Sequence, residues 1–150
     1  MKVQRLTPIL NVSSLQESFE WFEKLGWRKV FDWGEPPTFG GVCNGDVAIF
    51  LCQNGQGSRG GPIPTYETSG GWISFLGDDE AGGVWMSWKL ESTGAVDAAY
   101  QLAIRNGLMV TMPPIDEPWN VREFHLRHPD GHMFRVGADL EEAHSCGSRS

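Results

Sequence analysis

The stretch LTPILNVSSLQESFEWFEKLGW, residues 6–27, decides the fold, because within it the apolar residues change from a strand spacing to a helix spacing. In the first part, Pro8, Leu10 and Val12 alternate with more polar neighbours, which is typical of an extended strand. Ser13 and Ser14 then provide hydroxyls that accept from unpaired amides at a helix start. The helix buries one face and ends at a glycine suited to a left-handed backbone; the residues concerned are Leu15, Phe19, Phe22, Leu25 and Gly26.

Three short strands are predicted after this helix, at about residues 27–33, 38–43 and 47–52. The turns between them lie at residues 34–37 and at Asn44-Gly45, and an Asn-Gly pair is a strong signal for a tight hairpin. In the third strand Val47, Ile49 and Leu51 are expected to face the helix. Ala48, Phe50 and Cys52 then point to the opposite face.

The second half of the chain repeats the same order. A strand at residues 84–90 is followed by a helix at 95–106 and by strands at about 110–112, 121–127 and 132–136. Val96, Ala99, Tyr100 and Ala103 are the expected inner face of that helix, and Gly107 its end. An internal repeat of strand, helix and three strands predicts an α+β fold in which two βαβββ modules form a curved mixed sheet around a cavity.

The domain organisation follows from this repeat. We expect a single domain, residues 1–150, with module one at 3–55, a Gly-rich linker at 56–83, module two at 84–138 and a frayed tail at 139–150. The linker is too polar and too interrupted to predict a core element. Four apolar residues within it are expected to anchor it to the body: Trp72, Ile73, Phe75 and Leu76.

Composition restricts the classes of function. A net charge of −7 argues against a nucleic-acid partner, because neutralising phosphates requires clustered Lys and Arg. No apolar run of membrane length or secretion signal is apparent, so the cytoplasm is the expected compartment. Three cysteines without a CxxC pair fit reduced thiols there. Seven tryptophans are an unusual number, and enough to line a cavity as well as fill a core.

Three stretches together resemble the glyoxalase/bleomycin-resistance/dioxygenase superfamily, and its bleomycin-resistance branch in particular. These are the opening strand and helix at 6–27, the helix from Val96 to Gly107, and the closing hairpin REFHLRHPDGH at 122–132. The resemblance covers about residues 3–55 and 83–138 in the family's order. It implies the two-module fold and a homodimer whose cavities take walls from both chains, and the long linker favours the same pairing.

Members of this family that use a metal place His or Glu ligands on the cavity face of the first and last strand of each module. The matching positions here are Thr7, Phe50, Trp85 and Arg135, none of which is a usual metal ligand. The family's metal chemistry is therefore not expected here, and no cofactor is predicted. Strand alternation adds Glu123 and His125 to the same face as Arg135, if Pro129-Asp130-Gly131 forms a three-residue hairpin loop.

The candidate ligand-binding residues are thus Thr7, Phe50, Trp85, Glu123, His125 and Arg135. Simpler roles compete with this one. Phe50 and Trp85 are alternatively cavity-filling core residues, and Arg135 alternatively forms an ion pair with Glu123. His128 and His132 flank a turn, where we expect a solvated surface pair rather than a metal site. Trp33, Phe39 and Trp119 lie near strand ends, where alternation does not fix their direction.

Three functions remain open. The first, which we favour, is metal-free binding of a small aromatic or cationic organic molecule, such as sequestration of a bleomycin-type antibiotic. The second is a metal-dependent lyase, isomerase or dioxygenase of the same superfamily, which the loss of all four ligand positions disfavours. The third is a metal-free enzyme that uses His125 and Glu123.

Overall fold

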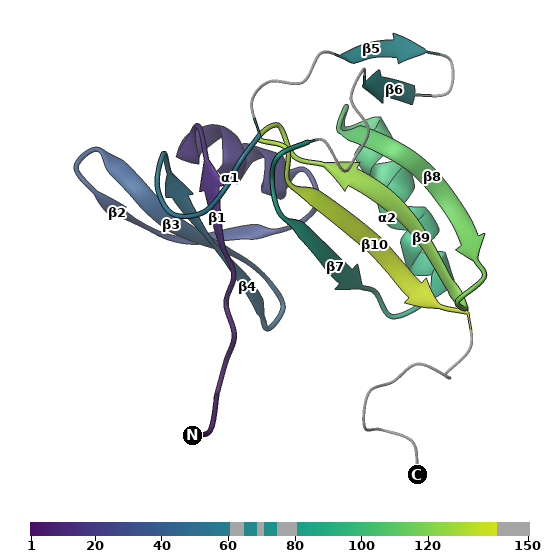
Figure 1. The fold of residues 1–150 in the computed structure, drawn as a ribbon, viewed down its shortest axis with the longest axis horizontal. Helices are drawn as coiled ribbons and strands as arrows, with labels where there is room; N and C mark the ends of the chain where they lie inside the picture. The colour runs from purple at the N-terminus through teal and green to yellow at the C-terminus, as the bar shows by residue number, and fades with distance from the viewer. Residues whose placement is uncertain (61–64, 69–70, 75–80, 141–150) are drawn as a thin grey trace.

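The computed structural model describes residues 1–60, 65–68, 71–74 and 81–140, with residues 65–68 and 71–74 described by their backbone alone. The two predicted βαβββ modules are present, each as its own four-stranded mixed sheet with one helix (Figure 1). The elements of module one are β1 (Ile9–Val12), α1 (Leu15–Glu23), β2 (Arg28–Gly34), β3 (Pro37–Asn44) and β4 (Val47–Gln53). Those of module two are β7 (Trp85–Lys89), α2 (Thr93–Arg105), β8 (Met109–Glu117), β9 (Val121–Arg127) and β10 (Met133–Asp139).

Both sheets have the same topology, which confirms the internal repeat. The strand order is β1-β4-β3-β2 in one sheet and β7-β10-β9-β8 in the other. In each, the first strand of the module pairs in parallel with its last strand, and the other pairs are antiparallel. The predicted α+β class is therefore correct, with two separate sheets in place of one continuous sheet.

The helices begin where serine side chains can cap them. Ser14 Oγ accepts from the amide of Glu17 at the start of α1, and Ser92 Oγ accepts from the amide of Ala95 at the start of α2. Because Ser92 is the cap, α2 begins at Thr93, two residues before the predicted start. Gly26 follows α1 with a φ of 87°, which is the left-handed end expected there.

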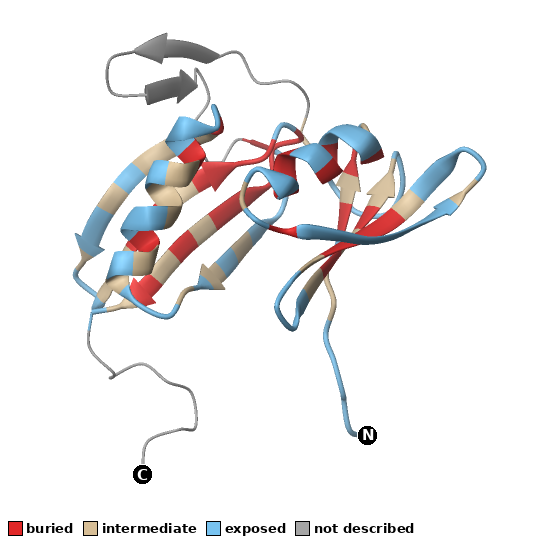
Figure 2. Cartoon of the chain, turned by 180° about the vertical axis from the view of Figure 1, so that it is seen from behind, coloured by how far each residue is buried: buried red, intermediate tan, exposed pale blue. Residues whose placement is uncertain are grey.

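The core lies between the helices and the sheets, and buried residues follow the inner helix faces and the middle strands (Figure 2). Phe22 from α1 and Phe134 from β10 are both fully buried and lie with their ring centroids 6.1 Å apart. Trp88 from β7 stacks on Phe134, with ring centroids 4.3 Å apart. Aromatic contacts of this kind add to the stabilisation that burial alone provides.

The bounds of β1 and β8 differ from those predicted. Residues 1–8 lie outside any strand, and β1 begins at Ile9. Strand β8 continues to Glu117, past Pro113-Pro114, with its pairing to β9 interrupted between Met112 and Ile115. Prolines lack the amide that a ladder needs, so an irregular register is the local consequence.

The linker contains a two-stranded hairpin that was not predicted, β5 (Thr65–Thr68) with β6 (Gly71–Ser74). The proposed anchoring contacts of Trp72, Ile73, Phe75 and Leu76 lie outside the residues whose side chains are described. Strand β10 extends to Asp139, and the tail beyond residue 140 also lies outside the described residues.

The closing hairpin has the predicted register. Gly131 is left-handed, with a φ of 83°, and the amide of His128 donates to the carbonyl of His132 at 2.9 Å. Leu126 therefore pairs with Phe134 and His125 with Arg135. A Cβ placed on Gly131 would lie 2.2 Å from the carbonyl oxygen of Ala81, so only glycine fits this turn.

We predict that Gly131→Ala lowers the free energy of unfolding by about 2 kcal/mol or more, because it adds a backbone clash to the strain of a left-handed alanine. Gly45→Ala is the matched control, since Gly45 also has a positive φ but its Cβ would meet nothing within 4 Å. The free energy of unfolding of Gly45→Ala should fall by about 1 kcal/mol. Urea denaturation of both variants measures the difference, and equal losses would contradict the crowding at Gly131.

Candidate functional site

A pocket of about 520 Å³ lies on the open face of the second sheet, opposite α2. The sheet register brings its walls together, because Arg135 on β10 pairs with His125 on β9, and β10 also pairs with the edge strand β7 that holds Trp85. The loop between β8 and β9 closes one end. The residues that line the pocket are Trp85, Glu117, Trp119, Glu123, His125 and Arg135.

The floor of this pocket is an ion pair. Arg135 donates from Nε to Glu123 Oε2 at 3.1 Å and from Nη2 to Glu123 Oε1 at 2.8 Å. The hydrogen bonds to the carboxylate raise the pKa of Arg135 above its ordinary value. The Glu123 side chain is 7% exposed, whereas that of Arg135 is 39% exposed. The predicted alternative of an ion pair is therefore real, yet the guanidinium still presents a surface to the pocket.

The walls are aromatic. The Trp85 ring meets His125 edge to face, with centroids 5.5 Å apart and planes at 85°. On the other side the Arg135 Cζ lies 5.9 Å from the centroid of the Trp119 ring. Trp85 is 40% exposed and Trp119 is 50% exposed, so both rings keep large faces that no described residue covers. Such a pocket is suited to stacking on a planar molecule and to fixing its polar end.

Four of the six predicted site residues thus share one pocket: Trp85, Glu123, His125 and Arg135. The other two lie elsewhere. Phe50 packs with Phe31 and Phe39 on the open face of the first sheet, at centroid distances of 5.7 and 5.6 Å. Thr7 lines a separate cleft between the N-terminal residues, β4 and β7.

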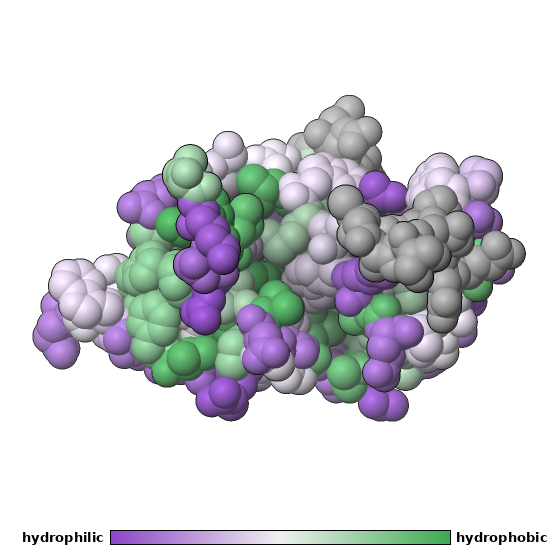
Figure 3. Space-filling model, turned by 90° about the horizontal axis from the view of Figure 1, so that it is seen from below, coloured by the Kyte–Doolittle hydropathy of each residue, from purple (hydrophilic) through white to green (hydrophobic). Residues whose placement is uncertain are grey.

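The open faces of the two sheets look in different directions within one chain. Helix α1 lies above the first sheet in Figure 1, whereas α2 lies behind the second sheet. Seen from below, the molecular surface carries a group of hydrophobic residues on its module-one half (Figure 3). Phe50 and Trp85 consequently do not line a common cavity within a single chain.

Glu117 is a pocket residue that sequence reasoning did not assign, and Trp119 is one whose direction alternation left open. Glu117 is the last residue of β8, and Trp119 sits in the turn before Asn120, which has a φ of 65°. Alternation along a strand does not reach into such a turn. The one sequence feature that indicated a role for Trp119 was its position in a polar turn, where a large apolar ring is unusual unless it contacts a ligand or another protein.

The family's metal ligands have no counterparts here. Thr7, Phe50, Trp85 and Arg135 offer one hydroxyl, two apolar rings and a permanent cation, a set that does not suit a divalent metal. No cluster of three or more His, Cys, Asp or Glu side chains able to hold a metal ion occurs among the described residues.

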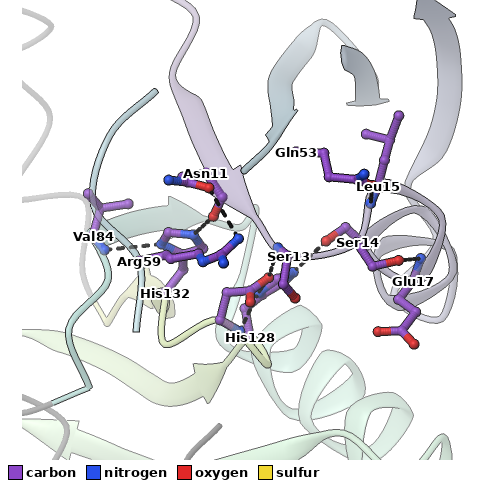
Figure 4. A network of polar contacts seen from close by, with 12 residues as sticks. Asn11, Ser13, Ser14, Leu15, Glu17, Gln53, Arg59, Val84, His128 and His132 are labelled. Atoms are coloured by element: carbon purple, nitrogen blue, oxygen red, sulfur yellow. Dashed lines mark hydrogen bonds and ion pairs between the residues drawn. The ribbon is translucent and has the colours of Figure 1, made fainter. Parts of the chain in front are cut away.

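His128 and His132 are buried, 1% and 0% exposed, so the prediction of a solvated surface pair is wrong. Both rings lie where the closing hairpin meets module one (Figure 4). The amide of Val84 donates to His132 Nδ1 at 3.1 Å, which leaves the proton on Nε2 to be donated to the carbonyl of Asn11 at 2.7 Å. One imidazole thereby joins β1 of module one to the start of module two.

His128 makes a second joint of the same kind. The amide of Asp130 donates to His128 Nδ1 at 3.0 Å, so Nε2 carries the proton and donates to Ser18 Oγ on α1 at 3.0 Å. The Asp130 carboxylate accepts from the amide of Ser13 at 2.9 Å. Ser18, His128 and Asp130 are not a catalytic triad, because the serine is 2% exposed and the imidazole donates to it instead of accepting its proton.

Burial lowers the pKa of both histidines. Loss of solvent around His128, reinforced by the neighbouring His132, lowers its pKa to about 3. The pKa of His132 is also lowered, mainly by burial. Both tautomers are fixed by backbone amides that donate to Nδ1, so a proton at Nδ1 would face another N–H.

We predict that the protein loses stability as the pH falls from 7 to 5. Unfolded histidine has a pKa near 6.5, so in this range the unfolded chain binds protons that folded His128 does not bind. The effect is absent above about pH 7 and grows as the pH falls toward the folded value of about 3. One such histidine amounts to about 2 kcal/mol between pH 7 and pH 5.

Urea denaturation at pH 7, 6 and 5 measures this loss. His128→Gln is the control. Because the substitution weakens the joint, this variant should be less stable than the parent at pH 7. Its free energy of unfolding should, however, fall by about 2 kcal/mol less than that of the parent between pH 7 and pH 5. Stability that is unchanged between pH 7 and pH 5 would contradict the buried, uncharged histidine joint.

The model of the Glyoxalase/Bleomycin resistance protein/Dioxygenase superfamily matches residues 3–136. The chain therefore belongs to this superfamily. No curated protein gives a significant sequence match. In addition, none of the helices in the described residues is long and apolar enough to cross a membrane.

Solved structures show the same fold at low sequence identity. A glyoxalase/bleomycin resistance protein/dioxygenase from Nocardioides is 21% identical, with a TM-score of 0.64 over 99% of this chain and 93% of that one. A bleomycin resistance determinant encoded on the transposon Tn5 is 15% identical, with a TM-score of 0.64 over 93% and 100%. A bleomycin-binding protein complexed with bleomycin is also 15% identical, with a TM-score of 0.62 over 91% and 99%.

Proposed function

We propose that this protein binds a small planar organic molecule, aromatic or cationic, in the module-two pocket without a metal or cofactor. The observation that carries the proposal is the pair of exposed tryptophans on either side of the Arg135–Glu123 ion pair. The pocket contains two carboxylates, Glu117 and Glu123, and one guanidinium, so its charge favours a cationic group over an anionic one.

Sequestration of a bleomycin-type antibiotic is the form of this function that the comparisons support best. Two proteins of the same fold are described as a bleomycin resistance determinant and a bleomycin-binding protein. Three cysteines without a CxxC pair support a cytoplasmic setting.

Binding is favoured over metal-free catalysis by the position of His125. Its Nε2 lies 3.8 Å from Glu123 Oε1, beyond hydrogen-bond distance, while both oxygens of that carboxylate already accept from Arg135. A general base is normally oriented by a close hydrogen bond to its carboxylate partner. The carboxylate here orients the guanidinium instead.

We predict that Trp85→Ala weakens binding by about 2 kcal/mol, or about thirtyfold in Kd, because it removes one stacking wall. Trp85→Phe keeps an aromatic face and should stay within about threefold of the parent. Calorimetric titration with metal-free bleomycin and with the planar cation proflavine measures both variants, and melting curves check that each is folded. If Trp85→Ala binds as tightly as the parent, the pocket is not the binding site.

We further propose that two copies form a homodimer in which module one of one chain covers the module-two pocket of the other. Within one chain the two open faces look in different directions, so neither covers the other. The N-terminal segment and β2 leave apolar residues exposed, which favours a protein contact; among them are Leu6, Val30, Phe31 and Trp33. Phe50 and the pocket would then contribute to one shared site.

This arrangement predicts a particle of twice the chain mass of 16.7 kDa at micromolar concentration. Light scattering coupled to gel filtration measures that mass. Trp33→Glu, which places a charge on the exposed apolar face, should shift the particle toward the monomer. A parent protein that already runs at 16.7 kDa would contradict the dimer, and the pocket would then be formed by module two alone.

A further inference from the structure

The module-two pocket holds two opposite charges that the protein itself does not join. Arg135 and Glu117 both line it, and Arg135 is paired with Glu123. The half-buried Glu117 side chain, in contrast, forms no hydrogen bond or ion pair with the part of the chain that the structure describes. Its carboxylate therefore stays available to a bound molecule.

The sheet register places this carboxylate near the guanidinium. Ile115 of β8 pairs with Glu123 of β9, and Glu117 follows on the same face of β8. Diagonal neighbours of this kind lie about 7–8 Å apart. The hydrogen bond to Glu123 is the main cause of the raised pKa of Arg135, and the nearby charge of Glu117 adds to it. Because the two groups are close but not in contact, a small polar group fits between them.

Arg135 offers hydrogen-bond donors to that space. A guanidinium has five N–H groups, and Glu123 accepts only from Nε and from one N–H of Nη2. Nη1 donates to no acceptor among the described residues, and it is not one of their buried polar atoms. Since the side chain is 39% exposed and lines the pocket, a ligand can reach these N–H groups.

The two groups together select one kind of ligand edge. Arg135 requires an acceptor, and the Glu117 carboxylate requires a donor. A ligand carboxylate would pair with Arg135 but would face two carboxylates of the pocket, whereas an ammonium placed there would face the guanidinium. A neutral group that carries an acceptor beside a donor satisfies both side chains without either repulsion.

We propose that the planar ligand of this pocket carries an acceptor next to a donor on one edge, as an aromatic carboxamide does. The acceptor binds Arg135 Nη1, and the donor binds the Glu117 carboxylate. This inference rests on the function proposed for the pocket and specifies which planar molecules it takes. A cationic substituent elsewhere on the ligand is compatible with it, because the pocket has more carboxylates than guanidinium groups.

Three isosteric naphthalenes separate the two hydrogen bonds. 2-Naphthamide carries both the acceptor and the donor. 2-Acetylnaphthalene keeps the carbonyl but has a methyl group in place of the amide nitrogen, and 2-isopropenylnaphthalene has neither polar group. Calorimetric titration should give affinities that fall about tenfold at each step, because both hydrogen bonds involve a charged partner.

Glu117→Met removes the carboxylate that accepts from the ligand. This variant should bind 2-naphthamide and 2-acetylnaphthalene within about twofold of each other, and should still prefer the ketone to the hydrocarbon. Asp116→Asn is the matched control. Asp116 precedes Glu117 on β8 but pairs with Arg122 outside the pocket, so its variant should keep both preferences.

The acceptor contact is tested by replacing the ion pair as a whole. The double variant Glu123→Met with Arg135→Met leaves no buried charge unpaired, and melting curves show that it is folded. It should bind 2-acetylnaphthalene and 2-isopropenylnaphthalene within about twofold of each other.

Three outcomes overturn the proposal: no binding of 2-naphthamide up to its solubility limit, equal affinities for the three naphthalenes, or a preference for 2-naphthamide over the ketone that survives in Glu117→Met. Proflavine separates these results from a failure of the proposed function. If proflavine binds and Trp85→Ala weakens its binding, the proposed function stands and only the ligand edge is wrong. If neither proflavine nor any naphthalene binds, both are wrong.

Discussion

The closing hairpin at residues 128–132 holds the two modules together, and the rest of the structure depends on that joint. His132 accepts from Val84 and donates to Asn11, while His128 donates to Ser18 and the Asp130 carboxylate accepts from the amide of Ser13. The contacts with Asn11, Ser13 and Ser18 join the hairpin to residues more than a hundred positions earlier, in module one. The contact with Val84 joins it to the start of module two. Neutral imidazoles serve this purpose well, because they pair with backbone groups inside the protein without burying a charge.

The same joint explains why the two open faces diverge. It fixes α1 against the hairpin of module two, so that the aromatic helix face and Phe134 share one core. The open faces of the sheets are then left outward, one with a cluster of phenylalanines and the other with two tryptophans around an ion pair. Binding surfaces built on strands of this kind are held more firmly than those on loops.

Much of this structure was predictable because the decisive signals are local. The change of spacing after Val12, the serines before the first helix and the recurrence of one element order predicted the repeat. The Pro-Asp-Gly turn predicted the register that unites Glu123, His125 and Arg135. The burial of His128 and His132 was not predictable, because it arises from contact with module one, and a turn sequence carries no sign of that contact. The separation of Phe50 from Trp85 was not predictable for a similar reason. Alternation assigns a side chain to one face of its sheet, but it does not predict how the two sheets are oriented relative to each other.

In the proposed function, a planar organic molecule binds between Trp85 and Trp119 in the module-two pocket. A ¹H–¹⁵N titration with proflavine tests it most directly, because each tryptophan contributes one indole N–H signal. We predict that the signals of Trp85 and Trp119 shift together along one binding curve while that of buried Trp21 stays in place. Shifts confined to Trp27 and Trp88, or no shift at all for Trp85 and Trp119 with both proflavine and metal-free bleomycin, would contradict it.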